Sequence, residues 1–210
     1  MHLVTLLDWE PDHITQVIDN AIKVKGNQKE YANTLNNKTL CMLFQKTSTR
    51  TRVSFEAGMT QLGGHAIFLD WRASNFTLGA IKDEIRCLDR YSDIIMARVY
   101  KHADIKAMAD ASNVPVINAL CNLYHPCQTL ADLMTMKEKK GDLKDLKIAF
   151  VGDGNNVCNS TIIGGAKVGA NVSVATPKGF EPHESAVSLG KELGKLELFN
   201  DPAEAVKDAD

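Results

Sequence analysis

The chain has 210 residues, of which 44% are hydrophobic and 24% charged, and its formal net charge is −2. This composition is typical of a soluble globular protein with one large or two small domains. The near-neutral charge excludes a global attraction to nucleic acid or to an anionic membrane, so any anion-binding site must be local. No apolar run approaches the ~20 residues of a membrane span.

The N-terminus and the cysteines indicate the cellular compartment. The first eight residues lack the basic segment and the long apolar stretch of a secretory signal. The five cysteines are odd in number and include no C-x-x-C pair, which favours reduced thiols over disulfides or a zinc site. We therefore predict a cytoplasmic protein with reduced thiols.

Short apolar runs alternate with amphipathic segments along the chain. We predict strands at 40–44, 65–70, 94–100, 114–119, 146–151, 171–175 and 196–199. We predict helices at 8–24, 53–62, 83–91, 103–111, 129–139, 157–168, 184–193 and 202–207. The alternation favours parallel sheets covered on both faces, and hence an α/β fold with two doubly wound domains, 1–143 and 144–210. With about three strands, the second domain is predicted to be incomplete.

The stretch Ser48-Thr49-Arg50-Thr51-Arg52 lies at the turn between the first strand and the following helix. Backbone N–H groups and the positive end of the helix dipole converge at such a turn and bind phosphate. Arginine adds bidentate charged donors, and the hydroxyls add short ones. The alternative is an N-cap followed by two solvated arginines. We favour the anion site, because two arginines and three hydroxyls are dense for a cap.

Other polar residues also follow predicted strands, where ligands bind in open parallel sheets. They are Arg98, His125 with Gln128, and Asn155 with Asn156. Because these residues fall in both predicted domains, we predict a site in a cleft between the domains.

Arg98 ends an otherwise apolar strand, so its charge needs a partner. An internal ion pair with an acid such as Asp93 is the alternative to a ligand. A histidine beside an anion turn and an arginine can donate to a developing oxyanion, whereas a lone His125 would be expected only to cap or pack. Cys127 is a poor candidate for a nucleophile, because no third group is evident that would orient it.

The segment Gly152-Asp153-Gly154-Asn155-Asn156 follows a strand and resembles the start of a dinucleotide site. The third glycine position is Val157, however, and no acid ends the next strand. The glycines more simply make a tight turn that presents asparagines, whose amides suit an amino-acid head group.

Together these motifs resemble the aspartate/ornithine carbamoyltransferase superfamily, and within it the ornithine branch. The segments that carry the resemblance, which extends over nearly the whole chain, are 46–56, 96–100, 125–133 and 151–157. The resemblance implies a carbamoyl phosphate-binding domain, an ornithine-binding domain and a cytoplasmic homotrimer in arginine metabolism. It implies that carbamoyl phosphate and L-ornithine are the substrates, without a metal or organic cofactor.

The resemblance also implies roles for individual residues. The phosphate is held by Ser48, Thr49, Arg50 and Thr51. The carbamoyl oxygen is polarised by three catalytic residues, namely Thr51, Arg98 and His125. Gln128 holds the carbamoyl nitrogen, and Asn156 binds ornithine.

Two departures from the family pattern affect these expectations. The stretch 76–81 is shorter than the family loop that reaches a neighbouring subunit. The family's later ornithine-binding motifs would lie beyond Asp210. We therefore expect weak carbamoyl phosphate binding without full activity from these 210 residues. The alternatives are a catalytically deficient carbamoyl phosphate-binding paralogue, a carbamoyltransferase for another amine, and, disfavoured by Val157, a nucleotide-dependent dehydrogenase.

Overall fold

The computed structural model describes all residues from 1 to 210, which divide into two compact units. The first unit contains Met1–Val4 and Lys23–Asn122, and the second contains Thr5–Ile22 and Leu123–Asp210. Each unit holds one parallel sheet, so the predicted α/β class with two parallel sheets is confirmed.

The sheet of the first unit has four parallel strands in the order β2-β1-β3-β4. The strands are β1 (Thr39–Phe44), β2 (His65–Asp70), β3 (Ile94–Arg98) and β4 (Val116–Leu120). The N-terminal segment adds a short bridge beside β4, where Leu3 pairs with Ile117. Strand β3 ends at Arg98, two residues before the predicted end.

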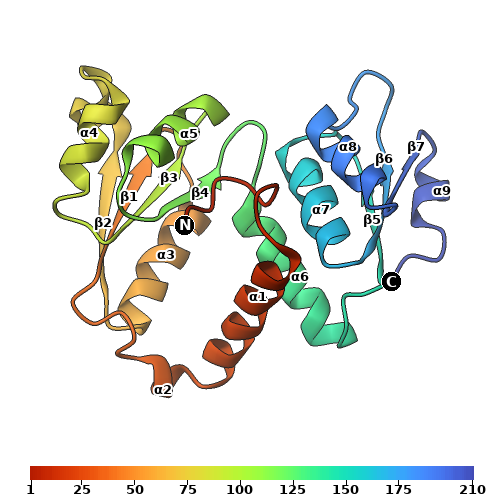
Figure 1. The fold of residues 1–210 in the computed structure, drawn as a ribbon, viewed down its shortest axis with the longest axis horizontal. Coiled ribbons are helices and arrows are strands. Elements are labelled where there is room, and N and C mark those ends of the chain that lie inside the picture. The colour runs from red at the N-terminus through yellow and green to blue at the C-terminus, as the bar shows by residue number, and fades with distance from the viewer. The chain divides into compact units, whose positions relative to one another are not determined.

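The helices of this unit cover both faces of its sheet (Figure 1), as expected for a doubly wound fold. Helix α3 (Thr49–Gln61) lies on one face, and α4 (Ile81–Leu88) and α5 (His102–Ala111) lie on the other. The short helix α2 (Gln28–Tyr31) precedes β1, and two 3-10 turns, η1 (Trp71–Ala73) and η2 (Asn75–Thr77), follow β2. Leu40, Met42 and Phe44 of β1 form a buried cluster with Met59 of α3. This cluster fixes α3 against the sheet.

The second unit contains a three-stranded parallel sheet in the order β5-β6-β7. Its strands are β5 (Lys147–Val151), β6 (Asn171–Ala175) and β7 (Leu196–Phe199). Its helices are α6 (Pro126–Lys140), α7 (Asn156–Lys167), α8 (Glu184–Glu192), α9 (Pro202–Val206) and most of α1 (Pro11–Gly26). Figure 1 shows α7 and α8 on one face of this sheet and α9 on the other.

Side-chain contacts attach the N-terminal segment to this second unit. Lys137 of α6 pairs with Asp19 of α1. The ammonium of Lys167 on α7 donates to the carbonyls of Leu7 and Trp9. Partial burial lowers the pKa of Lys167, an effect opposed by nearby acidic residues. These contacts place α1 with the second unit, although it precedes the first sheet in the sequence.

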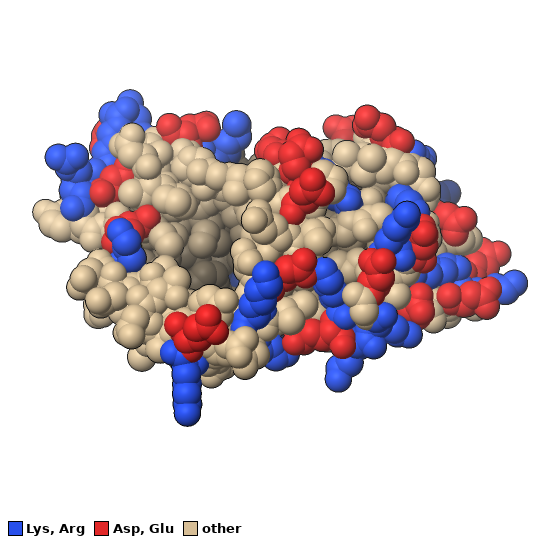
Figure 2. All heavy atoms as spheres, turned by 60° about the horizontal axis from the view of Figure 1, so that its bottom comes forward, with Lys and Arg blue, Asp and Glu red and all other residues tan.

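No helix has both the length and the apolar character needed to cross a membrane. Basic and acidic side chains are interspersed on the face that Figure 2 shows.

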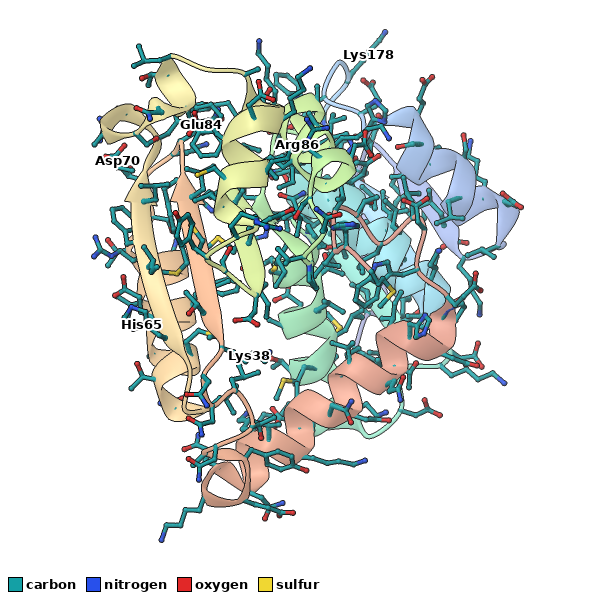
Figure 3. The ribbon with its side chains drawn as sticks, turned by 60° about the vertical axis from the view of Figure 1, so that its left-hand side comes forward. Lys38, His65, Asp70, Glu84, Arg86 and Lys178 are labelled. Carbon is teal, nitrogen blue, oxygen red and sulfur yellow. The ribbon has the colours of Figure 1, made fainter.

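Figure 3 shows His65 and Asp70 at opposite ends of β2, so Asp70 marks the carboxyl end of the first sheet. The candidate site residues of the first unit lie toward that end.

Candidate active site

The first unit has a topological switch point between β1 and β3. From β1 the chain passes to β2 on one side, and β3 then pairs with β1 on the other side. Loops diverge at such a point and leave a crevice beyond the carboxyl ends of the strands, which is where open parallel sheets bind ligands. The Ser48–Arg52 turn follows β1, and Arg98 ends β3. The structure therefore brings these two predicted groups to neighbouring strand ends.

Ser48 caps helix α3. Its backbone is extended, and its Oγ accepts a hydrogen bond from the backbone N–H of Thr51 at 3.3 Å. The same Oγ donates to Oγ1 of Thr51 at 3.0 Å. Because Ser48 caps it, α3 begins at Thr49, four residues before the predicted start, and Thr49, Arg50 and Thr51 form its first turn. The N-cap that the sequence offered as the alternative is therefore present, and the anion site at the same turn stays a prediction.

Arg98 carries a positive charge that no carboxylate neutralises. Its Nε is buried without a hydrogen-bond partner. Burial lowers the pKa of Arg98, and the charge of Arg50 lowers it further. The alternative pairing with Asp93 is wrong, because Asp93 precedes β3 and instead binds Lys38 at 2.8 Å and the N–H of Thr39 at 2.9 Å. Two neighbouring guanidinium groups with an unmet donor favour an anion at this position.

The local backbone also positions Arg98. The pairing of β3 with β4 shifts register between Ala97 and Arg98, so that Arg98 lies opposite Leu120. Such irregularities redirect side chains at the ends of strands. Gln45 connects this strand end to the phosphate turn. Its backbone N–H donates to the carbonyl of Arg98 at 2.9 Å, and its Oε1 accepts from the N–H of Tyr100 at 2.8 Å.

Arg52, the second arginine of the turn, has partners within the protein. Its Nε donates to Glu56 at 2.9 Å, and its guanidinium lies 3.8 Å from the ring centroid of Phe68. A pocket of about 350 Å³ lies here, lined by the end of β1, the first turn of α3 and the end of β2. Arg52 therefore forms part of a wall, whereas Arg50 is exposed beside Arg98.

His125 lies in the second unit as the N-cap residue of α6. Its backbone N–H donates to the buried Oγ of Ser160 on α7 at 2.8 Å. The two preceding residues are also attached. Nδ2 of Asn159 donates to the carbonyl of Leu123 at 3.1 Å, and the hydroxyl of Tyr124 bonds Oγ of Ser185 at 2.8 Å. Three consecutive residues are thus held by hydrogen bonds, which fix the position of the His125 backbone.

Gln128 is exposed in the first turn of α6. Its amide nitrogen donates to Asp132, one turn later, at 2.9 Å.

Burial raises the pKa of the neighbouring Cys127 thiol to about 12. A thiol with that pKa remains protonated at neutral pH, so the structure argues against Cys127 as a nucleophile.

The two asparagines of the turn after β5 have different positions at the start of α7. Oδ1 of Asn155 caps α7 by accepting from the N–H groups of Val157 and Cys158 at 2.9 and 3.2 Å. Asn156 is the first residue of the helix. Gly154 allows a close approach by the chain itself, because a Cβ there would lie 2.4 Å from the backbone of Glu181. A loop of the protein therefore covers this turn, which disfavours a dinucleotide site.

The sequence pattern did not reveal the residues that hold the site residues in place. Asn159 and Ser160 are buried polar residues beside an apolar run in α7, and such residues need partners. That pattern was a usable signal, although it could not name the partners. Gln45 gave no such signal, because a single glutamine after a strand is common.

The fold and these residues define a parallel α/β protein with a candidate anion site at the N-terminus of α3. Residues 1–138 match the family model described as aspartate/ornithine carbamoyltransferase, carbamoyl-P binding domain, and residues 144–210 match that family's Asp/Orn binding domain. The chain belongs to the aspartate/ornithine carbamoyltransferase family of transferases.

Individual relatives agree with this assignment. Ornithine carbamoyltransferase from Methanocaldococcus jannaschii is 48% identical over 219 aligned positions, covering 100% of the chain and 71% of the relative. The structure of ornithine carbamoyltransferase from Pyrococcus furiosus superposes with a TM-score of 0.95 at 48% identity, covering 100% of the chain and 69% of that structure. The Thermus thermophilus enzyme gives 0.89 at 39% identity, covering 97% and 70%.

Proposed function

We propose that this protein transfers the carbamoyl group of carbamoyl phosphate to the δ-amine of L-ornithine, forming citrulline and phosphate. The observation that carries the proposal is the unneutralised charge of Arg98 beside Arg50, at the switch point where the Ser48-capped helix begins. Membership of the carbamoyltransferase family supports the reaction class. The ornithine carbamoyltransferase names of its relatives support ornithine as the acceptor.

In this proposal the first turn of α3 holds the phosphate. The N–H groups at a helix N-terminus favour an anion, and Arg50 adds a permanently charged donor there. The hydroxyls of Ser48, Thr49 and Thr51 complete the set. This arrangement stabilises the phosphate as it accepts the electrons of the breaking bond.

The carbamoyl group is polarised by preorganised donors. In the proposed reaction the neutral δ-amine attacks the carbamoyl carbon, and negative charge develops on the carbamoyl oxygen. Thr51, Arg98 and His125 stabilise that charge. Removing one such donor is expected to slow transfer by roughly 100- to 1,000-fold. No covalent nucleophile is needed, which agrees with the raised pKa of Cys127.

The acceptor side of the proposal rests on the second unit. Asn156 begins α7, where its amide can bind an amino-acid head group by both donation and acceptance. Gln128 holds the carbamoyl nitrogen.

The proposal includes the domain limits 1–143 and 144–210, a homotrimer, a cytoplasmic location and a role in arginine metabolism.

Calorimetry and a citrulline assay on the 210-residue chain test the two halves of this proposal separately. Titration with inorganic phosphate and with carbamoyl phosphate should give binding that Arg50→Ala weakens by at least tenfold. Arg86→Met removes an exposed arginine on α4 and serves as the matched control. Binding unaffected by Arg50→Ala would overturn the donor site. Formation of carbamoyl-aspartate instead of citrulline would overturn the choice of acceptor.

A further inference from the structure

Gln128 and Asp132 form a contact that the reaction outlined above does not use. They lie four residues apart on α6 and therefore on the same face of the helix. Nε2 of Gln128 donates to Oδ1 of Asp132 at 2.9 Å. Asp132 is half-buried, whereas Gln128 is exposed. The carboxylate is thus less exposed to solvent than the amide that donates to it.

The chemistry of a carboxylate decides which way this amide points. An ionised carboxylate only accepts hydrogen bonds, so it selects the NH₂ end of the glutamine side chain. The amide oxygen must then point away from Asp132. Without the carboxylate, the two ends of the amide could exchange by rotation about the last side-chain bond. The charge of Asp132 thus leaves the amide oxygen of Gln128, a hydrogen-bond acceptor, as the end that a ligand meets.

We propose that Asp132 is a positioning residue that holds the Gln128 amide with Oε1 facing outward, so that this position selects a ligand with an N–H donor. The inference rests on the proposed function, in which the carbamoyl NH₂ group is that donor. A ligand of the same shape with an oxygen in place of NH₂ would bring two acceptors together. Position 128 would therefore distinguish an amide from an acid.

Two stable phosphonates make this selectivity measurable. Phosphonoacetamide carries the amide NH₂ at the relevant position, and phosphonoacetate carries a carboxylate oxygen there. Calorimetry at pH 8 gives the ratio of their affinities for each variant. The starting protein should prefer the amide. Asp132→Asn allows the Gln128 amide to rotate, so we expect the preference for the amide to fall by on the order of tenfold.

A double-mutant cycle separates this effect from simple charge, since Asp132→Asn also removes a negative charge that repels the acid. In a Gln128→Ala background, Asp132→Asn should change the affinity ratio by less than about twofold. An equal change in both backgrounds would overturn the inference, because charge alone would then explain the result. The same conclusion would follow if Asp132→Asn left the ratio unchanged in the starting protein. Circular dichroism confirms that each variant is folded.

Inorganic phosphate distinguishes failure of this inference from failure of the proposed function. If the starting protein binds phosphate and both phosphonates but does not discriminate between them, the role of Asp132 is wrong and the donor site stands. If it binds none of the three at millimolar concentration, the carbamoyl phosphate assignment falls, and the inference falls with it.

Discussion

Oγ of Ser160 on α7 accepts a hydrogen bond from the backbone N–H of His125 at 2.8 Å. The two residues are 35 positions apart in the sequence. Ser160 is 2% exposed, so this acceptor is effectively withdrawn from water. Asn156, proposed to bind ornithine, lies four residues earlier on α7 and therefore on the same side of the helix. Helix α7 thus carries Asn156, the residue proposed to bind ornithine. It also holds the backbone of His125, the proposed hydrogen-bond donor to the oxyanion.

Replacing Ser160 with alanine should destabilise the protein by about 1–3 kcal/mol, because the His125 N–H is left without its acceptor. Chemical denaturation measures this change. Ser173→Ala is the matched control, since Ser173 is a 1% exposed serine on β6 in the same unit. Where transfer is measured, Ser160→Ala should also lower kcat more than KM rises. Equal effects of the two substitutions on both stability and kcat would contradict a specific role for Ser160.

Arg98 should show opposite effects on stability and on binding. Arg98→Met removes a half-buried charge that Arg50 repels, so the free energy of unfolding should stay the same or increase. Phosphate affinity should fall at least tenfold in the same variant, because a charge-assisted donor is lost. Thermal denaturation and calorimetry on one preparation measure both quantities. Loss of stability together with binding would mean that Arg98 is mainly structural.

The thiols should react in an order set by exposure and pKa. Cys87 is exposed, whereas burial raises the pKa of Cys127 to about 12 and that of Cys41 to about 11. Iodoacetamide at pH 8 should therefore modify Cys87 first, as mapped by mass spectrometry. Cys127→Ala should retain phosphate binding. Rapid modification of Cys127 in the folded protein would restore it as a candidate nucleophile.

The parts of the candidate site that the sequence alone locates depend on local pattern. Ser48 to Thr51 follow an apolar strand and begin a helix, and both features lie within a few residues of one another. The contact between Ser160 and His125 depends instead on how α7 packs against α6. Gly164 permits that packing, since a Cβ there would lie 2.5 Å from Cγ2 of Thr129. Adjacent glycines in a helix indicate close packing without naming the partner.

The strand boundaries illustrate the same limit. The apolar pattern through Tyr100 predicted a longer third strand, but the chain leaves the sheet after Arg98, where the pairing with β4 becomes irregular. Helix α6 begins at Pro126, before its predicted start at residue 129. Proline suits the first turn of a helix, because the N–H groups of that turn have no partner within the helix. Register and capping, which depend on neighbours in space, decided both boundaries.

The ion pair between Lys38 and Asp93 should make stability depend on pH in a predictable direction. The hydrogen bond from Lys38 lowers the pKa of Asp93, and the N–H of Thr39 lowers it further. A carboxyl group whose pKa is lower in the folded state than in the unfolded state stabilises the folded protein. This contribution is fully present at pH values above the unfolded-state pKa of ~3.9. That contribution is lost as the pH falls through the folded pKa. Lys38, labelled in Figure 3, precedes β1, and Asp93 precedes β3, so the pair connects the starts of two adjacent strands.

Asp93→Asn should therefore lower the free energy of unfolding at pH 7, and its difference from the starting protein should shrink toward zero as the pH falls well below ~4. Urea denaturation at a series of pH values measures the difference. Lys38→Met removes the largest cause of the lowered pKa, so Asp93→Asn in that background should show a much weaker dependence on pH. A difference that stays constant across the whole pH series would show that the Asp93 contact contributes through packing instead of charge.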